Sequence, residues 1–262
     1  MKTNLKNKKN LISVIITNYN KSYFLKKSLN KTINQSFKNF EIIVFDDKST
    51  DNSSNILKEY KNIKVIYNRK KKFNTPALNQ LNGIIKCLKL SRGNILCLMD
   101  ADDFFEKNKL KEVNKFFTKN KKANCLFNFP KIIDNNFTLK KRKVFNTWPR
   151  IFPTSCISVR KKLFLEFIKL SKPMSFNFLE IDTRFLLYSV FFNNEYNYIK
   201  KKLTVYNYDP NGITSNIKFF SKLWWIRRFQ AFEYLKYIKK QKNQKFVSNL
   251  DYCLTTLVNK IF

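Results

Sequence analysis

Carboxylates gather at two points of the sequence, each directly after a short apolar run. Asp46 and Asp47 follow one run, and Asp100, Asp102 and Asp103 follow another. One Asp after a strand is common as a helix cap, but three acids within four residues repel one another and exceed what a cap requires. A hard divalent ion, Mg²⁺ or Mn²⁺, relieves such repulsion, and it binds through one or two carboxylates together with substrate phosphates and water. These residues therefore indicate metal-assisted chemistry on a phosphorylated substrate.

The residue types that are scarce restrict the chemistry further. The 262 residues include no histidine, which excludes a Ser-His triad and a His-ligated metal, so proton transfer falls to Asp, Glu, Lys, Tyr or Cys. Only three glycines are present, which excludes a Gly-rich phosphate loop. The five cysteines are scattered without a C-x-x-C pair, and we expect buried, reduced thiols.

The net charge is +34, from 52 Lys and Arg against 18 Asp and Glu. A field of this sign attracts nucleic acid or anionic lipid, although a chain rich in Lys throughout acquires it without any specific partner. A nucleic-acid groove would not concentrate Asp at its centre, so we expect no specific nucleic acid. No apolar run approaches the roughly 18 residues of a membrane span, and the run after the N-terminus is short for a signal peptide. We expect a cytoplasmic protein, with peripheral contact at the inner face of an anionic membrane as an option.

The two acidic groups can act together only if strands and helices bring them close in space. In the first half of the chain, short β-branched runs alternate with stretches of helical spacing, which predicts an α/β fold with a mostly parallel sheet sandwiched by helices. The expected strands and helices are, in chain order, 11–17, 21–36, 41–45, 63–68, 76–90, 94–99 and 107–119. Parallel strands end at one edge of a sheet, where ligands bind in such folds, so the two acidic groups should meet there.

The second half is less regular. The expected elements are strands at 123–130 and 154–159, helices at 161–170 and 180–192, and a strand that ends in a turn at 210–212. The stretch 218–240 is typical of a basic, aromatic, amphipathic helix. Its apolar side chains suit either an anionic membrane surface or core packing. They are Phe219, Phe220, Leu223, Trp224, Trp225 and Phe229.

Three ordered motifs resemble the N-terminal half of the family 2 glycosyltransferases, which have the GT-A fold. They are SVIITNYNKSYFLKKSLNKTINQSF, FEIIVFDDKSTDNS and GNILCLMDADDFF. Later in the chain, LEIDTRF resembles the acceptor-side acidic motif of the family, and LTVYNYDPNGITS resembles its late turn. The resemblance implies a Rossmann-like GT-A fold with a helical C-terminal appendage.

The resemblance also implies a division of the chain. We expect a basic tail at 1–10 and a GT-A domain at 11–215, followed by a basic, amphipathic helical segment at 216–262. Within the GT-A domain, 11–120 would bind the nucleotide and 121–215 the acceptor.

On the nucleotide side, the resemblance assigns Thr17 and Tyr19 to the base and ribose of the donor. Asp47 is expected to accept a hydrogen bond from an N–H of a uracil-type base, with Asp46 beside it. Asp100 is expected to contact the ribose or the metal ion.

The metal ion is expected on the donor diphosphate. The resemblance assigns it to Asp102, with Asp103 as a further ligand or a neighbour of the ligands. Asp209 stands where many relatives have His, so it is either an oxygen ligand of the ion or a turn residue before Pro210. The family's frequent A-R-N triplet has no clear counterpart, which leaves Arg227 and Arg228 as candidates to bind the diphosphate, or as solvated residues of a packing helix.

For the general base, the resemblance points to Asp182, and Glu180 is the competing candidate. Two residues of a helix separated by one position diverge by about 200°, so we expect only one of them to face the site. Either could instead be a solvated acid at a helix start.

The function implied is an inverting, metal-dependent glycosyltransferase. It would move a sugar from a nucleotide-diphosphate donor, of the UDP type, to a hydroxyl of a glycan or lipid-linked acceptor in cell-surface polysaccharide or lipopolysaccharide synthesis. A metal ion neutralises the leaving diphosphate, and a carboxylate on the opposite side removes the acceptor proton. The alternative is a basic module that binds nucleic acid or membrane and has a GT-A-like fold without turnover.

Overall fold

The structure is a computed structural model that describes residues 11–133, 147–171, 174–207, 209, 212 and 217–262. The expected tail at 1–10 and residues 210 and 211 of the expected turn lie outside these ranges. The elements are β1 (Ile12–Asn18), α1 (Ser22–Ile33), β2 (Phe40–Asp46), α2 (Ser53–Lys58), β3 (Lys64–Tyr67), α3 (Pro76–Leu90), β4 (Ile95–Asp100), β5 (Phe104–Phe105), α4 (Lys109–Lys119), β6 (Cys125–Ile133), a 3₁₀ turn (Thr154–Cys156), β7 (Ile157–Arg160), α5 (Lys161–Leu170), α6 (Ile181–Leu187), a π-helical turn (Tyr188–Phe192), β8 (Tyr198–Asn207), α7 (Lys222–Gln241) and α8 (Leu250–Ile261).

One eight-stranded sheet has the order β3-β2-β1-β4-β7-β6-β8-β5. β1 to β4 pair in parallel, and so do β6 and β8, whereas β7 and β5 run antiparallel to their neighbours. The prediction of a mostly parallel sheet is therefore confirmed. The register pairs Thr17 of β1 with Asp100 of β4, and Asn18 with Asp46 of β2, so these three strands end together at one edge.

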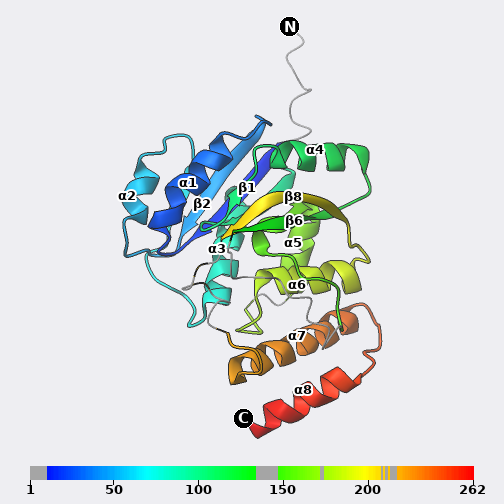
Figure 1. The fold of residues 1–262 in the computed structure, drawn as a ribbon. Helices are drawn as coiled ribbons and strands as arrows, with labels where there is room; N and C mark the ends of the chain where they lie inside the picture. Colours follow the sequence, from blue (N-terminus) through cyan, green and yellow to red (C-terminus); the bar gives the residue numbers. More distant parts are fainter. Residues whose placement is uncertain (1–10, 134–146, 172–173, 208, 210–211, 213–216) are drawn as a thin grey trace.

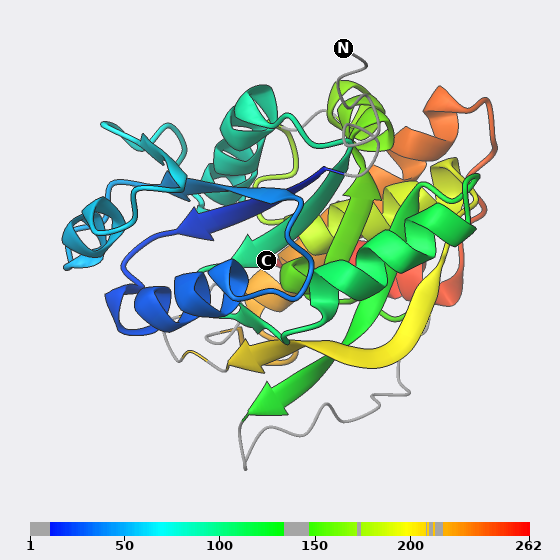
Figure 2. The same ribbon diagram turned by 90° about the horizontal axis from the view of Figure 1, so that it is seen from above.

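Helices cover both faces of the sheet. Successive side chains of β1 alternate between them: Val14 and Ile16 contact the layer of α1, α2 and α4, while Ile15 belongs to the core under α3, α5 and α6. Figure 2 shows α1 and α4 on one side of the strands and α3 on the other. Because the central strands are buried on both faces, they are apolar almost without interruption, which is the pattern that identified them in the sequence.

Two helices extend the fold beyond α6, on the side away from the sheet (Figure 1). α7 packs on α6 and the π-helical turn through Tyr234 and Leu235. α8 packs on another side of α7, where the rings of Phe232 and Tyr252 lie 5.4 Å apart. The sequence predicted one helix at 218–240 and did not separate α8. None of the helices in the described ranges has the length and apolar content needed to span a bilayer.

α3 approaches β2 so closely that Gly83 has no room for a side chain. A Cβ at this position would lie 2.3 Å from Cδ1 of the buried Phe45 ring. In a helix without steric conflict, Ala is more favourable than Gly by about 1 kcal/mol. Here the clash with Phe45 outweighs that gain, so the substitution is destabilising. We expect Gly83→Ala to lower the free energy of unfolding by roughly 1–3 kcal/mol in urea denaturation. Adding Phe45→Leu should recover part of that loss, and a Gly83→Ala variant as stable as the wild type would contradict the close approach.

Candidate active site

A cavity of about 1110 Å³ lies at the edge where the parallel strands end. Eight predicted site residues line it, namely Thr17, Tyr19, Asp47, Asp100, Asp102, Glu180, Asp182 and Asp209. The described part of the lining contributes six acids and three cations, the cations being Lys21, Lys71 and Arg150. A protein of net charge +34 thus has an acidic cavity.

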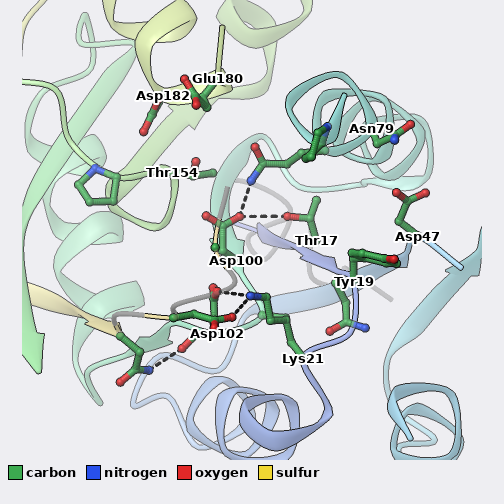
Figure 3. A pocket seen from close by; sticks show the side chains of 18 of the residues that line it. Thr17, Tyr19, Lys21, Asp47, Asn79, Asp100, Asp102, Thr154, Glu180 and Asp182 are labelled. Carbon is green, nitrogen blue, oxygen red and sulfur yellow. Dashed lines mark hydrogen bonds and ion pairs between the residues drawn. The ribbon is translucent and has the colours of Figure 1, made fainter. Parts of the chain in front are cut away.

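Asp100 ends β4 at the centre of this lining (Figure 3). Its Oδ1 accepts hydrogen bonds from Thr17 Oγ1 at 3.1 Å and from Gln80 Nε2 of α3 at 2.6 Å. Its backbone N–H donates to Ser155 Oγ at 2.9 Å. Burial and the nearby charge of Asp102 raise the pKa of Asp100 to about 7. Hydrogen bonds therefore hold the carboxyl in surroundings where its ionised form is disfavoured. A nearby cation would stabilise the ionised form.

A lysine ammonium lies between two of the four carboxylates that were expected to hold the metal ion. Lys21, immediately before α1, places its Nζ 3.1 Å from Asp102 Oδ2 and forms a second ion pair with Asp209 (Figure 3). Burial alone would lower the pKa of Lys21, but the two carboxylates hold it above its usual value. Burial also raises the pKa of Asp102, against the opposing effect of Lys21. Sequence reasoning missed Lys21, because no local spacing links it to an acid 188 positions later.

Two predicted acids lie behind the cavity and do not line it. Asp46, which is 3% exposed, accepts from Asn18 Nδ2 at 2.7 Å and from Ser49 Oγ at 2.6 Å, so it fixes the loop after β2. Asp103, which is 1% exposed, accepts from the backbone N–H of Asn207 at 3.1 Å. Burial raises the pKa of Asp103. Both acids build the walls of the site, and a ligand role for Asp103 stays a prediction.

Tyr19 and Asp47 lie at the end of the cavity expected to bind the base (Figure 3). The Tyr19 side chain is 43% exposed, and Lys71 Nζ lies 3.3 Å from the centre of its ring. Asp47 accepts a hydrogen bond from Asn68 Nδ2 at 2.7 Å. A half-exposed aromatic ring beside a fixed carboxylate suits a planar base with an N–H donor. Lys71 belongs to a short basic turn whose composition alone gave no sign of a site.

Glu180 and Asp182 both face the cavity from the start of α6 (Figure 3). The expectation that only one could do so is wrong, because Glu180 lies in extended backbone immediately before the helix. Glu180 forms an ion pair with Arg227, and burial raises its pKa to about 7 against the effect of that partner. Asp182 accepts from the backbone N–H of Thr183 at 2.5 Å and from its hydroxyl at 3.2 Å, and burial raises its pKa too.

The two arginines proposed for the diphosphate are not among the described residues that line the cavity. Arg227 contacts Glu180, which does line it, so a role at the edge of the site stays a prediction. Arg228 points to α8, where its Nε lies 2.9 Å from Asp251 Oδ1. Arg228 therefore joins α7 to α8.

The model of the protein family described as Glycosyl transferase family 2 matches residues 13–180. The chain belongs to this family. The predicted membership of a family of glycosyltransferase enzymes is thereby confirmed. The match spans β1 to the residue before α6, and so it includes the strand ends that deliver the acids to the cavity.

Several family 2 relatives have curated names. WfgD of Escherichia coli, a UDP-Glc:alpha-D-GlcNAc-diphosphoundecaprenol beta-1,3-glucosyltransferase, is 26% identical over 79% of this chain and 80% of its own. TuaG of Bacillus subtilis, a putative teichuronic acid biosynthesis glycosyltransferase, is 30% identical over 47% of each chain. An uncharacterized glycosyltransferase of Haemophilus influenzae is 33% identical over 47% of this chain and 38% of its own. The matches thus span less than half the length of the first curated relatives.

Solved structures share the fold. TarS 1–349 of S. aureus in complex with UDP superposes with a TM-score of 0.62 at 17% identity, covering 96% of this chain and 70% of that one. The mannosyltransferase PcManGT from Pyrobaculum calidifontis, in complex with GDP-Man and Mn²⁺, gives a TM-score of 0.55 at 12% identity, covering 95% and 69%. At these identities the likeness shows the fold alone, and it confirms the predicted GT-A fold.

The donor set at Lys21 fits a hard divalent ion. Asp102 and Asp209 direct carboxylate oxygens at one point, where the ammonium lies. Within the ranges that the structure describes, no group of three or more His, Cys, Asp and Glu side chains is placed to hold a metal ion. Two carboxylates completed by phosphate oxygens and water are a usual arrangement for Mg²⁺. Asp102 and Asp209 are therefore the residues that would hold an ion at this point.

Removal of the ammonium should ease the binding of an ion. Lys21→Met removes the ammonium that pairs with Asp102 and Asp209, so we expect Mn²⁺ to bind at least about tenfold more tightly in the absence of nucleotide, about 1.4 kcal/mol. Isothermal titration would measure this. Lys31→Met, which removes an exposed charge from α1, the helix that follows Lys21, is the matched control and should bind like the wild type. Equal Mn²⁺ affinities for Lys21→Met and wild type would show that ammonium and ion do not share a site.

Glu180 should make the stability of the free protein depend on pH. Its pKa is raised from 4.5 to about 7, so the folded state binds the proton more tightly than the unfolded state. This contribution to stability is fully present below about pH 4.5 and is lost as the pH rises through about 7. We expect Glu180→Gln to flatten the fall in unfolding free energy over that window by up to about 3 kcal/mol. Urea titrations at several pH values measure it. The exposed control Glu166→Gln should keep the wild-type slope, and an unchanged slope in Glu180→Gln would refute the assignment.

Proposed function

We propose that the protein is an inverting, metal-dependent glycosyltransferase that moves a sugar from a nucleotide-diphosphate donor to a hydroxyl of a glycan or lipid-linked acceptor. The observation that supports this most is that Asp100 and Asp102, at the end of β4, share one cavity with Asp182. A diphosphate beside Asp102 and an acceptor hydroxyl beside Asp182 leave the sugar between them. Residues 11–120 would bind the donor and 121–215 the acceptor.

Donor binding follows from the chain's own residues. Tyr19 offers a face for the base, and Asp47 can accept from its N–H, which favours a uracil-type base and hence a UDP-linked sugar. A divalent ion held by Asp102 and Asp209 would supply Lewis-acid stabilisation of the leaving diphosphate. Lys21, displaced from those carboxylates, would remain beside the diphosphate as a charge-assisted hydrogen-bond donor.

Asp182 is the better candidate for the general base. Arg227 engages Glu180, whereas the hydrogen bonds to Asp182 come from the neighbouring Thr183. A carboxyl whose pKa is raised by burial is a better proton acceptor near neutral pH than an ordinary one. Attack by the acceptor hydroxyl opposite the leaving diphosphate inverts the anomeric centre in a single displacement.

The relatives suggest the setting of the reaction. The name of WfgD specifies a sugar on diphosphoundecaprenol as acceptor, and that of TuaG specifies teichuronic acid synthesis. We infer a role in cell-surface polysaccharide or lipopolysaccharide synthesis, in the cytoplasm or at the inner face of the membrane. The second candidate is a basic binding module without turnover, which the net charge of +34 and the 16% aromatic content favour.

Nucleotide binding and transfer test this proposal. We expect Mn²⁺ to strengthen UDP binding to the wild type at least about tenfold in isothermal titration, because Asp102 would hold the ion beside the anionic diphosphate. Asp102→Ala should lose this enhancement. A panel of UDP-sugars offered with a lipid-diphosphate-linked acceptor should reveal transfer, and Asp182→Asn should lower kcat about 10²–10⁴-fold while it keeps UDP binding. Glu180→Gln, the matched variant, should lose less.

The opposite result is equally specific. A wild-type protein that binds RNA tightly, binds UDP no better with Mn²⁺, and neither transfers nor hydrolyses any sugar of the panel would establish the binding module.

A further inference from the structure

The two sides of α8 differ in character. One side packs on α7: Thr255 is fully buried, and Asn259 Nδ2 donates to the backbone oxygen of Trp225 at 3.1 Å. The other side is an apolar row made of Leu250, Leu254, Leu257 and Ile261, which are 90%, 41%, 58% and 76% exposed. Spacings of four, three and four residues place this row, here called the α8 stripe, within about 60° of arc. Single exposed leucines are common in proteins, but a continuous row marks an interaction surface.

The packed side of α8 is joined to the start of α7, close to the cavity. Asn259 ties the last turn of α8 to Trp225, whose ring stacks on that of Phe220 at 5.7 Å. Phe220 is 49% exposed, and Leu223, two residues before Trp225, lines the cavity. The packed side of α8 therefore rests on the part of α7 that is nearest the cavity, and the α8 stripe faces away from α7 at the far side of the molecule from the sheet (Figure 1).

Positive charge surrounds this surface. Residues 216–262 contain ten Lys and Arg against two acids. Both acids are paired, Glu233 with Lys236 and Asp251 with Arg228. Three exposed lysines lie on or near α8. Lys260 is in its last turn, Lys245 precedes it in the sequence, and Lys222 donates to the backbone oxygen of Phe262 just after it. A second copy of the chain would bring the same charge to the stripe and be repelled, whereas a layer of anionic headgroups complements both the lysines and the leucines.

We propose that the α8 stripe docks the protein on an anionic membrane, with α8 lying in the plane of the interface and its leucines among the acyl chains. Residues 218–240, which the sequence analysis offered for this contact, are less suited to it, because α7 lies between α6 and α8 and its Trp225 is only 7% exposed. Docking through α8 would bring the mouth of the cavity to the headgroups. That a lipid-linked acceptor is presented there rests on the proposed function, whereas docking itself does not.

Vesicle flotation of the full chain tests the proposal. The wild type should float with vesicles of phosphatidylcholine and phosphatidylglycerol, and much less with phosphatidylcholine alone. The double variant Leu254→Ser/Leu257→Ser should lower binding to the anionic vesicles at least about tenfold, because two leucines that would insert among the acyl chains are lost. The double variant Leu90→Ser/Leu165→Ser, which removes exposed leucines that are 48% and 41% accessible elsewhere, is the matched control and should float like the wild type.

Two further measurements separate the outcomes. Circular dichroism and UDP titration on each variant show whether the fold is kept, and light scattering in the absence of lipid shows the oligomeric state. Folded stripe and control variants that float equally would overturn the proposal. So would a wild-type dimer that the stripe variant converts to a monomer while neither floats, because the occupant would then be a second copy. Loss of flotation with UDP binding intact supports docking, and flotation without any UDP binding would count against the proposed function alone.

Discussion

The mutual repulsion of carboxylates at one edge of the sheet governs the organisation of the site. The register brings the ends of β1, β2 and β4 together, so it leaves no freedom to separate their acids. Burial then raises the pKa of Asp100, Asp102 and Asp182, which means that each charge is disfavoured where it stands. Two cations offset this in the free protein, Lys21 on the donor side and Arg227 on the acceptor side. Under the proposed function, a nucleotide with its ion would take over the first of these roles, so that ligand binding would itself compensate the charge.

In the core beneath the cavity, a buried lysine also compensates carboxylate charge. Lys109 of α4 is fully buried, and its Nζ donates to Asn128 Oδ1 and Thr204 Oγ1 at 2.9 Å each and to the backbone oxygen of Ser155 at 2.5 Å. Burial lowers the pKa of Lys109, while the charge of Asp103 acts against this effect. Because Ser155 also accepts from the backbone of Asp100, one ammonium joins α4, β6 and β8 to the residue that anchors the cavity. An apolar side chain here would leave these polar atoms and Asp103 without that partner.

The features that could be predicted from the sequence are those that follow from local residue patterns together with one rule of sheet topology. Apolar runs of strand length, alternating with helical spacing, predicted β1 to β4, and the rule that parallel strands end at one edge placed Asp47, Asp100 and Asp102 together. What the sequence could not supply were contacts set by tertiary packing. The ion pair of Lys21 with Asp209 closes a gap of 188 residues, and the reach of Glu180 depends on a helix that begins one residue later than assumed. α8 was not separated because its boundary follows a polar stretch without a glycine or proline to mark it.

The contrast between a basic exterior and an acidic cavity limits what can bind inside. A nucleic acid attracted by the field of +34 would meet the six carboxylates of the described cavity lining, which outnumber the three cations there. Under the proposed function, a nucleotide diphosphate with a divalent ion would suit both regions, because its phosphates are anionic and Asp102 and Asp209 would hold the ion. Anionic lipids would suit only the exterior, where their headgroups would face lysines and their acyl chains would face the exposed leucines of α8. A strongly basic surface attracts many anions without distinguishing them. It is nevertheless compatible with a selective cavity, because the choice of ligand there depends on the carboxylates that line the cavity.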